Sequence, residues 1–302
     1  MIEEHTIGEF TLVTLLDGIF LCSTDMIKAA ASEEGAALFK SAGLPASGPV
    51  PEPINAFLLK KNDELWLIDA GCGRELGPRF GKASAALLSA GYALDQIQGV
   101  IISHMHEDHV GGLIKEDGSA LYPNATLFLS HEELAFWTDP TAPEKHPQMS
   151  QAGLFKLANS ALTAYAPRIK ALPADAHVIP GVSLIPLHGH TPGHSGIQIE
   201  NSGQRVLIWG DGRAVGNLAG GIHGLAHGVR IDVRDDLAVD CLGADQGAGL
   251  PWPILLTAHG VASGLFHTWC TFGAGGRLHL DAGSQHSLYL RRAVCFQGWV
   301  GR

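Results

Sequence analysis

The spacing of hydrophobic and polar residues predicts strands and helices that are mixed along the first 210 residues. Short apolar or alternating runs bounded by turn-forming residues are typical of strands, whereas apolar residues repeating every three or four positions are typical of helices. We expect strands at 10–20, 54–60, 64–68, 99–103, 126–130, 182–187, 196–200 and 205–209. We expect helices at 26–41, 80–92, 131–137 and 148–165. This mixture favours one layered α/β domain spanning residues 1–302.

Two pairs of turn-forming residues predict where strands end. Asp17 and Gly18 are a turn signal within the first β-rich run, so we expect residues 10–20 to form one or two strands. Asn62 and Asp63 separate two apolar runs, which predicts a hairpin.

The composition of the chain changes after residue 211. The first 200 residues contain 12 Lys and Arg against 23 Asp and Glu, whereas the last 102 contain 8 against 7. No Lys follows Lys170, no Glu follows Glu200, and 17 of the 38 Gly residues follow Asp211. Only residues 254–257 resemble a strand there. Residues 212–302 are therefore a compositionally aberrant part, which either a loop-rich region or partial translation in a shifted reading frame would explain.

The overall composition excludes several classes of protein. With 46% hydrophobic residues, the chain has ample material for a core and is not globally disordered. It has no run of 18 apolar residues and no basic, apolar N-terminal segment, so we expect no membrane span, no export signal and a cytoplasmic location. The net charge of −10 argues against a nucleic-acid partner.

A dense group of metal-binding residue types follows the expected strand 99–103. His104, His106, Asp108 and His109 occur within six residues. Neutral imidazoles and carboxylates suit Zn²⁺ and related divalent ions. This spacing on a loop that leaves a strand predicts a metal site.

Other strand ends carry the same residue types. Asp69 and Asp211 each follow an expected strand, His190 and His194 lie in a Gly- and Pro-containing turn, and His259 follows the expected strand 254–257. Each residue alone is a weak signal. Together they supply enough ligands for a pair of metal sites, with Asp69 placed to accept a hydrogen bond from a metal-binding histidine.

This set resembles the metallo-β-lactamase superfamily, whose hallmark is HxHxDH followed by separate His, Asp and His ligands. The resemblance implies a four-layer αββα sandwich and two divalent metal ions, with zinc expected. It assigns His104, His106 and His190 to one metal, and Asp108, His109 and His259 to the other, with Asp211 bridging them. Asp69 and His194 would support these ligands.

Finer features resemble the methyl parathion hydrolase group of that superfamily. They are Asn55-Ala56-Phe57, Phe80-Gly81-Lys82, Gly111-Gly112-Leu113, Phe136-Trp137 and Ile208-Trp209-Gly210-Asp211. The resemblance implies that Phe136 or Trp137 lines an apolar leaving-group pocket, and that the protein forms a homodimer.

One stretch departs from the group's pattern. The group usually has Pro-Phe-Pro-Gly just after the last histidine ligand, whereas His259 is followed here by Gly260-Val261-Ala262-Ser263-Gly264. His267 is therefore the alternative to His259 as the last ligand.

The resemblance implies hydrolysis of a small-molecule substrate by a metal-bridging hydroxide, with Asp108 and Asp211 as the catalytic metal-holding carboxylates. Phosphotriesters such as methyl parathion are the leading substrate class, and aryl esters or lactones are possible side substrates. One alternative is an N-acyl homoserine lactonase, although many of these have a Tyr shortly after the bridging Asp, where this chain has Gly212-Arg213-Ala214-Val215. The other is a metal-binding fold with an impaired second site and little turnover.

Overall fold

The computed structural model describes residues 3–23, 48–173 and 175–211, three single residues (Glu33, Ala36 and Ala37), and three strands after residue 267. The larger sheet contains, in spatial order, β1 (Glu3–Ile7), β2 (Phe10–Ser23), β3 (Pro49–Lys61), β4 (Glu64–Ile68), β5 (Gly99–Ile101), β6 (Thr126–Ser130) and β7 (Ile169–Leu172). The smaller sheet has the order β11 (Gln204–Ile208), β10 (Ser195–Asn201), β9 (Val182–Pro186) and β8 (His177–Ile179). A third sheet has the order β12 (Thr268–Gly273), β13 (Arg277–Ala282) and β14 (Leu288–Leu290).

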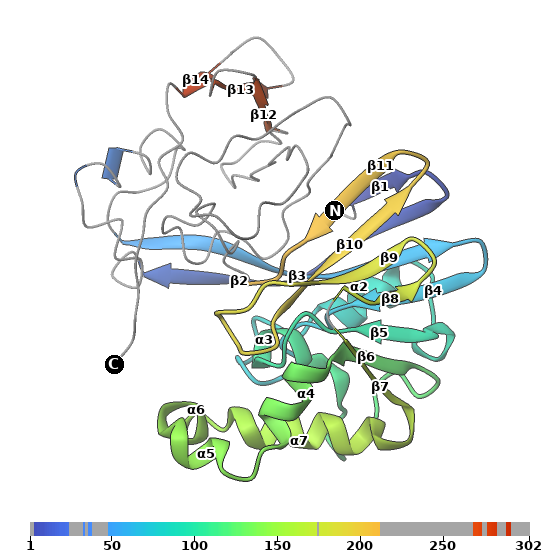
Figure 1. The fold of residues 1–302 in the computed structure, drawn as a ribbon, viewed down its shortest axis with the longest axis vertical. Helices are drawn as coiled ribbons and strands as arrows, with labels where there is room; N and C mark the ends of the chain where they lie inside the picture. Colours follow the sequence, from blue (N-terminus) through green and yellow to red (C-terminus); the bar gives the residue numbers. More distant parts are fainter. Residues whose placement is uncertain are drawn as a thin grey trace.

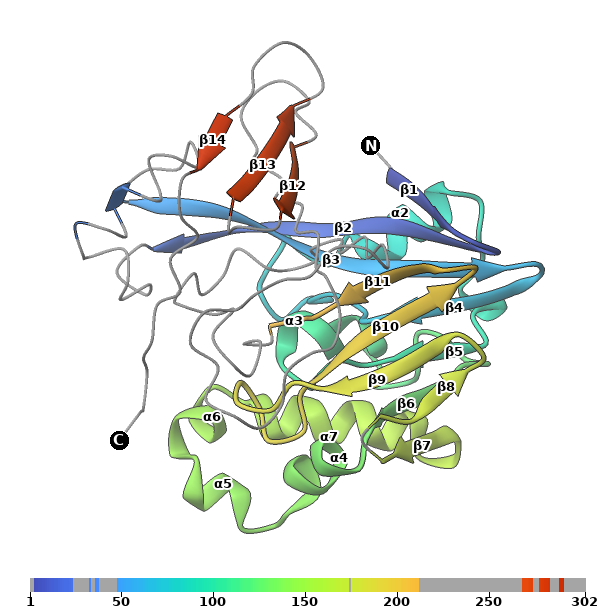
Figure 2. The same ribbon diagram turned by 45° about the horizontal axis from the view of Figure 1, so that its top comes forward.

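Helices connect β4 to β5, β5 to β6 and β6 to β7 in the larger sheet, and α4 to α7 lie together beside it (Figures 1 and 2). The α-helices are α2 (Ala83–Ser89), α3 (Glu107–Val110), α4 (His131–Thr138), α5 (Ala142–Lys145), α6 (Pro147–Gln151) and α7 (Leu154–Tyr165). The 3-10 helices are η3 (Leu94–Gln96), η4 (Gly111–Leu113) and η5 (Ala166–Arg168). Among the described residues, no helix has the length and apolarity needed to cross a bilayer.

Apolar side chains cover both faces of the larger sheet because successive residues of a strand point to opposite faces. On β3, Leu58 packs with the helices, whereas Phe57 and Leu59 pack against the smaller sheet. The core between the two sheets includes Ile197 and Val206 from the smaller one. The result is an α/β sandwich, as predicted. A helix layer on the outer face of the smaller sheet, which the four-layer αββα expectation implies, is not among the described residues.

The direction of the strands brings the expected functional loops together. β4, β5 and β6 run parallel, so their carboxyl ends lie at one edge of the larger sheet. Asp69 follows β4, His104 follows β5 closely, and Ser130 ends β6 at this edge. The backbone N–H of Ser195, at the start of β10, donates to the carbonyl of Ser103 over 2.9 Å, which ties the smaller sheet to the same edge.

Most of the predicted elements are confirmed. The hairpin around Asn62 and Asp63 joins β3 to β4. The expected strands at 99–103, 126–130, 182–187, 196–200 and 205–209 correspond to β5, β6, β9, β10 and β11, and the helix at 131–137 corresponds to α4. The expected helix at 80–92 is shorter and forms α2. Most of 26–41 and all of 254–257 lie outside the described residues.

One prediction about local structure is wrong. The expected helix at 148–165 is broken into α6 and α7 at Gly153, whose φ of 80° is incompatible with a continuous helix. Of the one or two strands expected over 10–20, the structure has one, because β2 continues past Asp17 and Gly18 to Ser23 through an irregularity between Leu16 and Gly18. Strands β1, β7, β8 and β12 to β14 are not foreseen by the sequence pattern.

The irregularity in β2 gives Asp17 a structural role. This fully buried carboxylate accepts hydrogen bonds from the backbone N–H groups of Cys72, Gly81 and Ala83 over 2.9–3.0 Å. It thereby holds the segment between β4 and α2 against β2. A turn-forming residue type in the sequence is here a buried acceptor, because local pairing is replaced by tertiary hydrogen bonds.

Replacing this acceptor should destabilise the fold. In Asp17→Ala three buried N–H groups lose their partner, so we expect the free energy of unfolding to fall by about 3 kcal/mol. Urea denaturation followed by circular dichroism measures this loss. Asp63→Ala, at an exposed turn position, is the control and should change stability by less than about 0.5 kcal/mol. Equal stability of the two variants would contradict the role of Asp17.

Candidate metal centre

Loops from both sheets converge at the shared edge. His104 and His106 follow β5, Asp108 and His109 lie on α3, and His190 lies between β9 and β10. Met105, between the first two histidines, points into the hydrophobic core and is fully buried. Extended backbone around Met105 thus directs the two histidines away from the core.

The nitrogen atoms of three imidazoles face one point. His104 Nε2 lies 3.1 Å from His106 Nδ1, which lies 2.9 Å from His190 Nε2. One imidazole nitrogen carries either a proton or a lone pair, so His106 Nδ1 cannot form good hydrogen bonds with both neighbours. Ligands of a tetrahedral zinc ion with Zn–N bonds of about 2.0–2.1 Å lie about 3.3 Å apart. The donor set therefore fits a shared divalent cation better than a hydrogen-bond network.

A second group adjoins the first through Asp211. Its Oδ1 lies 3.3 Å from His109 Nε2, and its Oδ2 lies 3.4 Å from His190 Nε2. His109 Nε2 also lies 3.5 Å from Asp108 Oδ2. One carboxylate thus spans two neighbouring donor groups, which is the placement that a bridging ligand requires. His104, His109 and Asp211 also offer ligand atoms that all lie within 4.8 Å of one another.

Asp69 organises the loop after β5 by accepting three hydrogen bonds. Its Oδ1 accepts from the Ser103 N–H and its Oδ2 from the Ser103 hydroxyl, both over 2.8 Å, and Oδ2 lies 2.8 Å from His109 Nδ1. The carboxylate holds His109 so that Nε2 faces Asp211. Asp69 has a φ of 54°, an uncommon conformation for a residue with a side chain.

His194 lies behind the cluster. Its ring is fully buried at 4.7 Å from the His104 ring centroid, and its Nε2 accepts a hydrogen bond from the backbone N–H of Asp211 over 3.1 Å. The side chain thus positions the backbone of Asp211.

Electrostatics divide the histidines into two kinds. Burial, together with neighbouring imidazoles, lowers the pKa of His104 well below its usual value and lowers the pKa of His106 to about 4. Burial also lowers the pKa of His194 to about 3. These rings are neutral at pH 7, as metal ligands must be. For His109 burial also disfavours the charge, but the carboxylates of Asp108, Asp69 and Asp211 prevail and raise its pKa.

Two buried carboxyl groups near the centre were not foreseen. Burial raises the pKa of Glu52 on β3 to about 8, and the nearby charges of Asp211 and Asp108 add to this effect. Glu133 on α4 is fully buried and accepts a hydrogen bond from the backbone N–H of Met105. The spacing of Ser130 and Glu133 in the sequence could have indicated a helix cap, but not a contact with the loop after β5.

The two predicted pocket residues, Phe136 and Trp137, differ in how deeply they are buried. Trp137 is 1% exposed and packs within the core, with its ring 5.8 Å from His106 and 4.9 Å from Phe155. Its prediction as a pocket-lining residue is therefore wrong in this structure, because the ring supports His106 from the core side. Phe136 is half-buried, and its ring lies 5.2 Å from His146.

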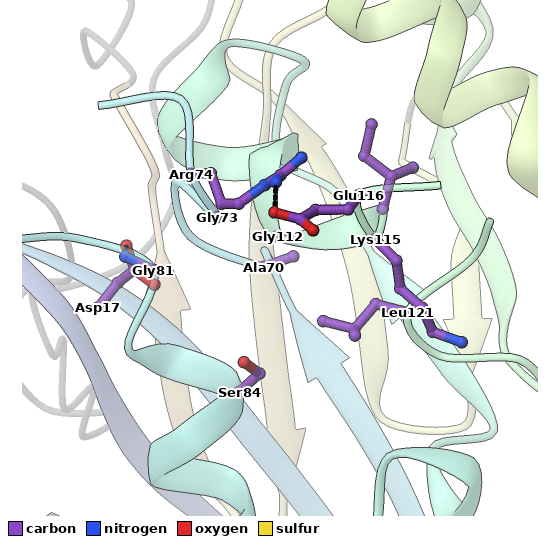
Figure 3. A pocket seen from close by; sticks show the side chains of 11 residues that line it. Asp17, Ala70, Gly73, Arg74, Gly81, Ser84, Gly112, Lys115, Glu116 and Leu121 are labelled. Carbon is purple, nitrogen blue, oxygen red and sulfur yellow. Dashed lines mark hydrogen bonds and ion pairs between the residues drawn. The ribbon is translucent and has the colours of Figure 1, made fainter. Parts of the chain in front are cut away.

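A small cavity lies between β2, the segment from β4 to α2, and the segment that follows α3. It has a volume of about 230 Å³ and includes Asp17, Ala70, Gly112 and the exposed ion pair between Arg74 and Glu116 (Figure 3). None of the predicted metal ligands lines it. Since Asp17 is already engaged by backbone N–H groups, this cavity has no converging free donor set comparable to the histidine cluster.

The last predicted ligand cannot be placed. His259 and its alternative His267 lie outside the described residues. The structure therefore brings together six predicted ligands, His104, His106, Asp108, His109, His190 and Asp211, with the supporting residues Asp69 and His194.

Comparisons with known proteins agree with this fold. The profile of the metallo-β-lactamase superfamily matches residues 49–234, which is more than half of the chain. The chain belongs to the metallo-β-lactamase superfamily.

Individual relatives cover parts of the chain. The solved structure of the hydrolase AbOPH of the β-lactamase superfamily is 31% identical, with a TM-score of 0.63 over 70% of this chain and 73% of that chain. AidC, a dizinc quorum-quenching lactonase, has the same fold with a TM-score of 0.62, 24% identity, and coverage of 70% of this chain and 74% of that one. An N-acyl homoserine lactonase from Bacillus thuringiensis is 28% identical over 123 residues, or 40% of this chain. The match spans about two fifths (41%) of that curated relative.

Removing the acceptor of His109 tests the geometry of the centre. In Asp69→Asn an amide NH₂ replaces one acceptor oxygen, so His109 loses the partner that orients it. We expect one of two zinc sites to weaken by about 10–100-fold, as measured by titrating the metal-free protein with Zn²⁺. Asp95→Asn, on an exposed 3-10 helix, is the control and should bind as the unmodified chain does. Unchanged zinc binding in Asp69→Asn would rule out this role.

Proposed function

We propose that the protein is a dinuclear metal-dependent hydrolase whose leading substrates are phosphotriesters. The observation that carries this proposal is the position of Asp211 between two donor groups, 3.3 Å from His109 and 3.4 Å from His190. Two divalent ions, with zinc expected, would supply a water of lowered pKa and an electrophile for a P=O or C=O oxygen.

Some residues would bind the metal ions directly, and others orient those ligands. His104, His106 and His190 would hold one ion, and Asp108 and His109 would hold the other together with His259. These assignments rest on the sequence resemblance and are supported by the distances among the described side chains. The role of Asp69 is to fix His109 and the loop after β5, so that the ligands need little rearrangement on binding.

The choice of phosphotriesters rests on the finer resemblance to the methyl parathion hydrolase group. An aryl-oxide leaving group needs little protonation. The reaction therefore requires little beyond the nucleophile and the electrophile that bound metal ions would supply. Phe136, which is half-buried on α4, is the side chain that we assign to an aryl pocket, because Trp137 is enclosed by the core.

Lactone hydrolysis is the second candidate function. It is favoured by the 28% identity to an N-acyl homoserine lactonase and by the fold shared with the lactonase AidC. Both reactions require attack on an electrophilic centre whose oxygen is polarised by a metal. The same ligands therefore serve either substrate, and turnover must decide between them.

Hydrolysis by the zinc-loaded protein tests the proposed function. We expect p-nitrophenolate release from methyl parathion and paraoxon, loss of the activity after chelation, and recovery when Zn²⁺ is returned. Asp211→Asn should lower kcat/KM by at least about a hundredfold because it replaces one of the two carboxylate oxygens that face the two donor groups with an NH₂ group. Asp95→Asn serves as the control and should retain full activity.

The same assay separates the candidate functions. Ring opening of N-acyl homoserine lactones without phosphotriester turnover would replace the leading function with the second one. Two bound zinc ions without turnover of either substrate class would contradict both.

His259 and His267 can be separated by zinc content. If His259 is the seventh ligand, His259→Ala reduces zinc from two ions per chain to one and lowers turnover, whereas His267→Ala changes neither. Elemental analysis after gel filtration measures the zinc content. The reverse pattern would assign the ligand to His267, and no change in either variant would indicate a centre completed without these histidines.

A further inference from the structure

A single buried carboxylate joins the two loops that carry the first group of histidines. Glu133 Oε1 accepts from the backbone N–H of Met105 over 2.9 Å and from Trp137 Nε1 over 2.6 Å. Its Oε2 accepts from the Thr191 hydroxyl over 2.6 Å and from the backbone N–H of Gly193 over 3.1 Å. All four donors therefore belong either to loops of the centre or to the tryptophan that packs under it.

Two of these donors are direct neighbours of the three histidines in the sequence. Met105 lies between His104 and His106, and Thr191 directly follows His190. The carboxylate consequently fixes the backbone beside all three imidazoles that face one point. Because the side chain is fully buried, each of these hydrogen bonds is shielded from water, and loss of one leaves an unsatisfied polar group.

The packing of α4 against the loop after β9 supports the same arrangement. Ser130 Oγ donates to the carbonyl of Gly193 over 2.7 Å and accepts from the backbone N–H of Glu133. A Cβ atom on Gly193 would lie 1.9 Å from the backbone nitrogen of Glu133, so only glycine permits this close approach. The loop that carries His190 is thus docked directly on the first turn of α4.

We propose that Glu133 is a positioning residue for the metal site formed by His104, His106 and His190. It holds the loop after β5 and the loop before β10 at the separation that brings these nitrogens together. Asp69 orients the second donor group through His109, and it also holds Ser103, whose hydroxyl lies 3.1 Å from His104 Nδ1. This inference rests on the proposed function and adds that Glu133 acts on the first metal site, whereas the hydrogen bond that orients His109 in the second comes from Asp69.

Glu133→Gln tests this division. Glutamine keeps the shape of the side chain but replaces one acceptor oxygen with an NH₂ donor, so two of the four donors lose their acceptor. We expect titration of the metal-free protein with Zn²⁺ to show one site of unchanged affinity and one site weakened by about tenfold or more. Glu132→Gln, which removes the same charge from an exposed position of α4, should bind two zinc ions as the unmodified chain does.

A double variant shows whether the two carboxylates act on different sites. Glu133→Gln combined with Asp69→Asn should weaken both zinc sites, because Glu133→Gln loosens the loops of the first donor group and Asp69→Asn disturbs His109 in the second. One tight site remaining in the double variant would overturn the division. Two tight sites in folded Glu133→Gln would overturn the role of Glu133 itself.

Two further variants distinguish positioning from general stability. Tyr165→Phe removes core hydrogen bonds to Leu113 and Tyr122, so it should lower the melting temperature and leave both zinc affinities unchanged. Weakened zinc binding in Tyr165→Phe would indicate that any loss of stability has this effect, which would overturn the proposal. If Glu133→Gln does not fold, Thr191→Val removes one donor alone and should weaken one site to a smaller extent; unchanged affinity would overturn the proposal.

The unmodified chain separates failure of this inference from failure of the proposed function. An unmodified chain that binds no zinc would overturn the proposed function and this inference together. Two zinc ions in the unmodified chain, with the same two affinities in Glu133→Gln, would overturn this inference alone.

Discussion

The arrangement of the centre depends on one constraint, namely that a carboxylate removed from water must be matched by hydrogen-bond donors. Three buried carboxylates meet it with groups from loops that leave the strands. Asp17 accepts from the segment between β4 and α2, Asp69 from Ser103 and His109, and Glu133 from the loops around Met105 and Thr191. Each loop is consequently held in one conformation, although loops generally lack the repeating hydrogen bonds of helices and strands.

This constraint also explains the charge of the centre. The rings of His104, His106 and His194 are neutral because burial and neighbouring imidazoles lower their pKa. The carboxylates of Asp69, Asp108 and Asp211 instead act together on His109 and raise its pKa. Neutral nitrogen donors therefore adjoin a group of negative charges, and divalent cations would balance these charges while using the nitrogens as ligands.

The sequence predicted the parts of this centre that depend on local pattern. Apolar runs identify β5 and β6, and the HxHxDH residues follow β5, so parallel strand ends bring the histidines to one edge. Asp17 and Glu133 could not be assigned in this way, because the backbone N–H groups that Asp17 binds lie 55 or more residues away, and the loop donors that Glu133 binds lie 28 or more residues away. Their local signals, a turn and a helix cap, indicate conformation but not which loop the side chain reaches. Gly153 likewise breaks an apolar pattern that is otherwise helical.

The residues at the shared edge of the two sheets account for metal binding, but they do not select between the two substrate classes. Its ligands, and the carboxylates that hold them, would serve a phosphotriester and a lactone equally, since both need a nucleophile and a polarised oxygen. Trp137 cannot distinguish these substrates, because it is enclosed between His106 and Phe155 and acts on the centre through packing. Discrimination must therefore come from side chains other than Trp137. Phe136, which we propose for this role, is half-buried on α4, and its ring packs on that of Trp137. Selectivity can then change while the buried hydrogen bonds of Asp69 and Glu133 remain intact.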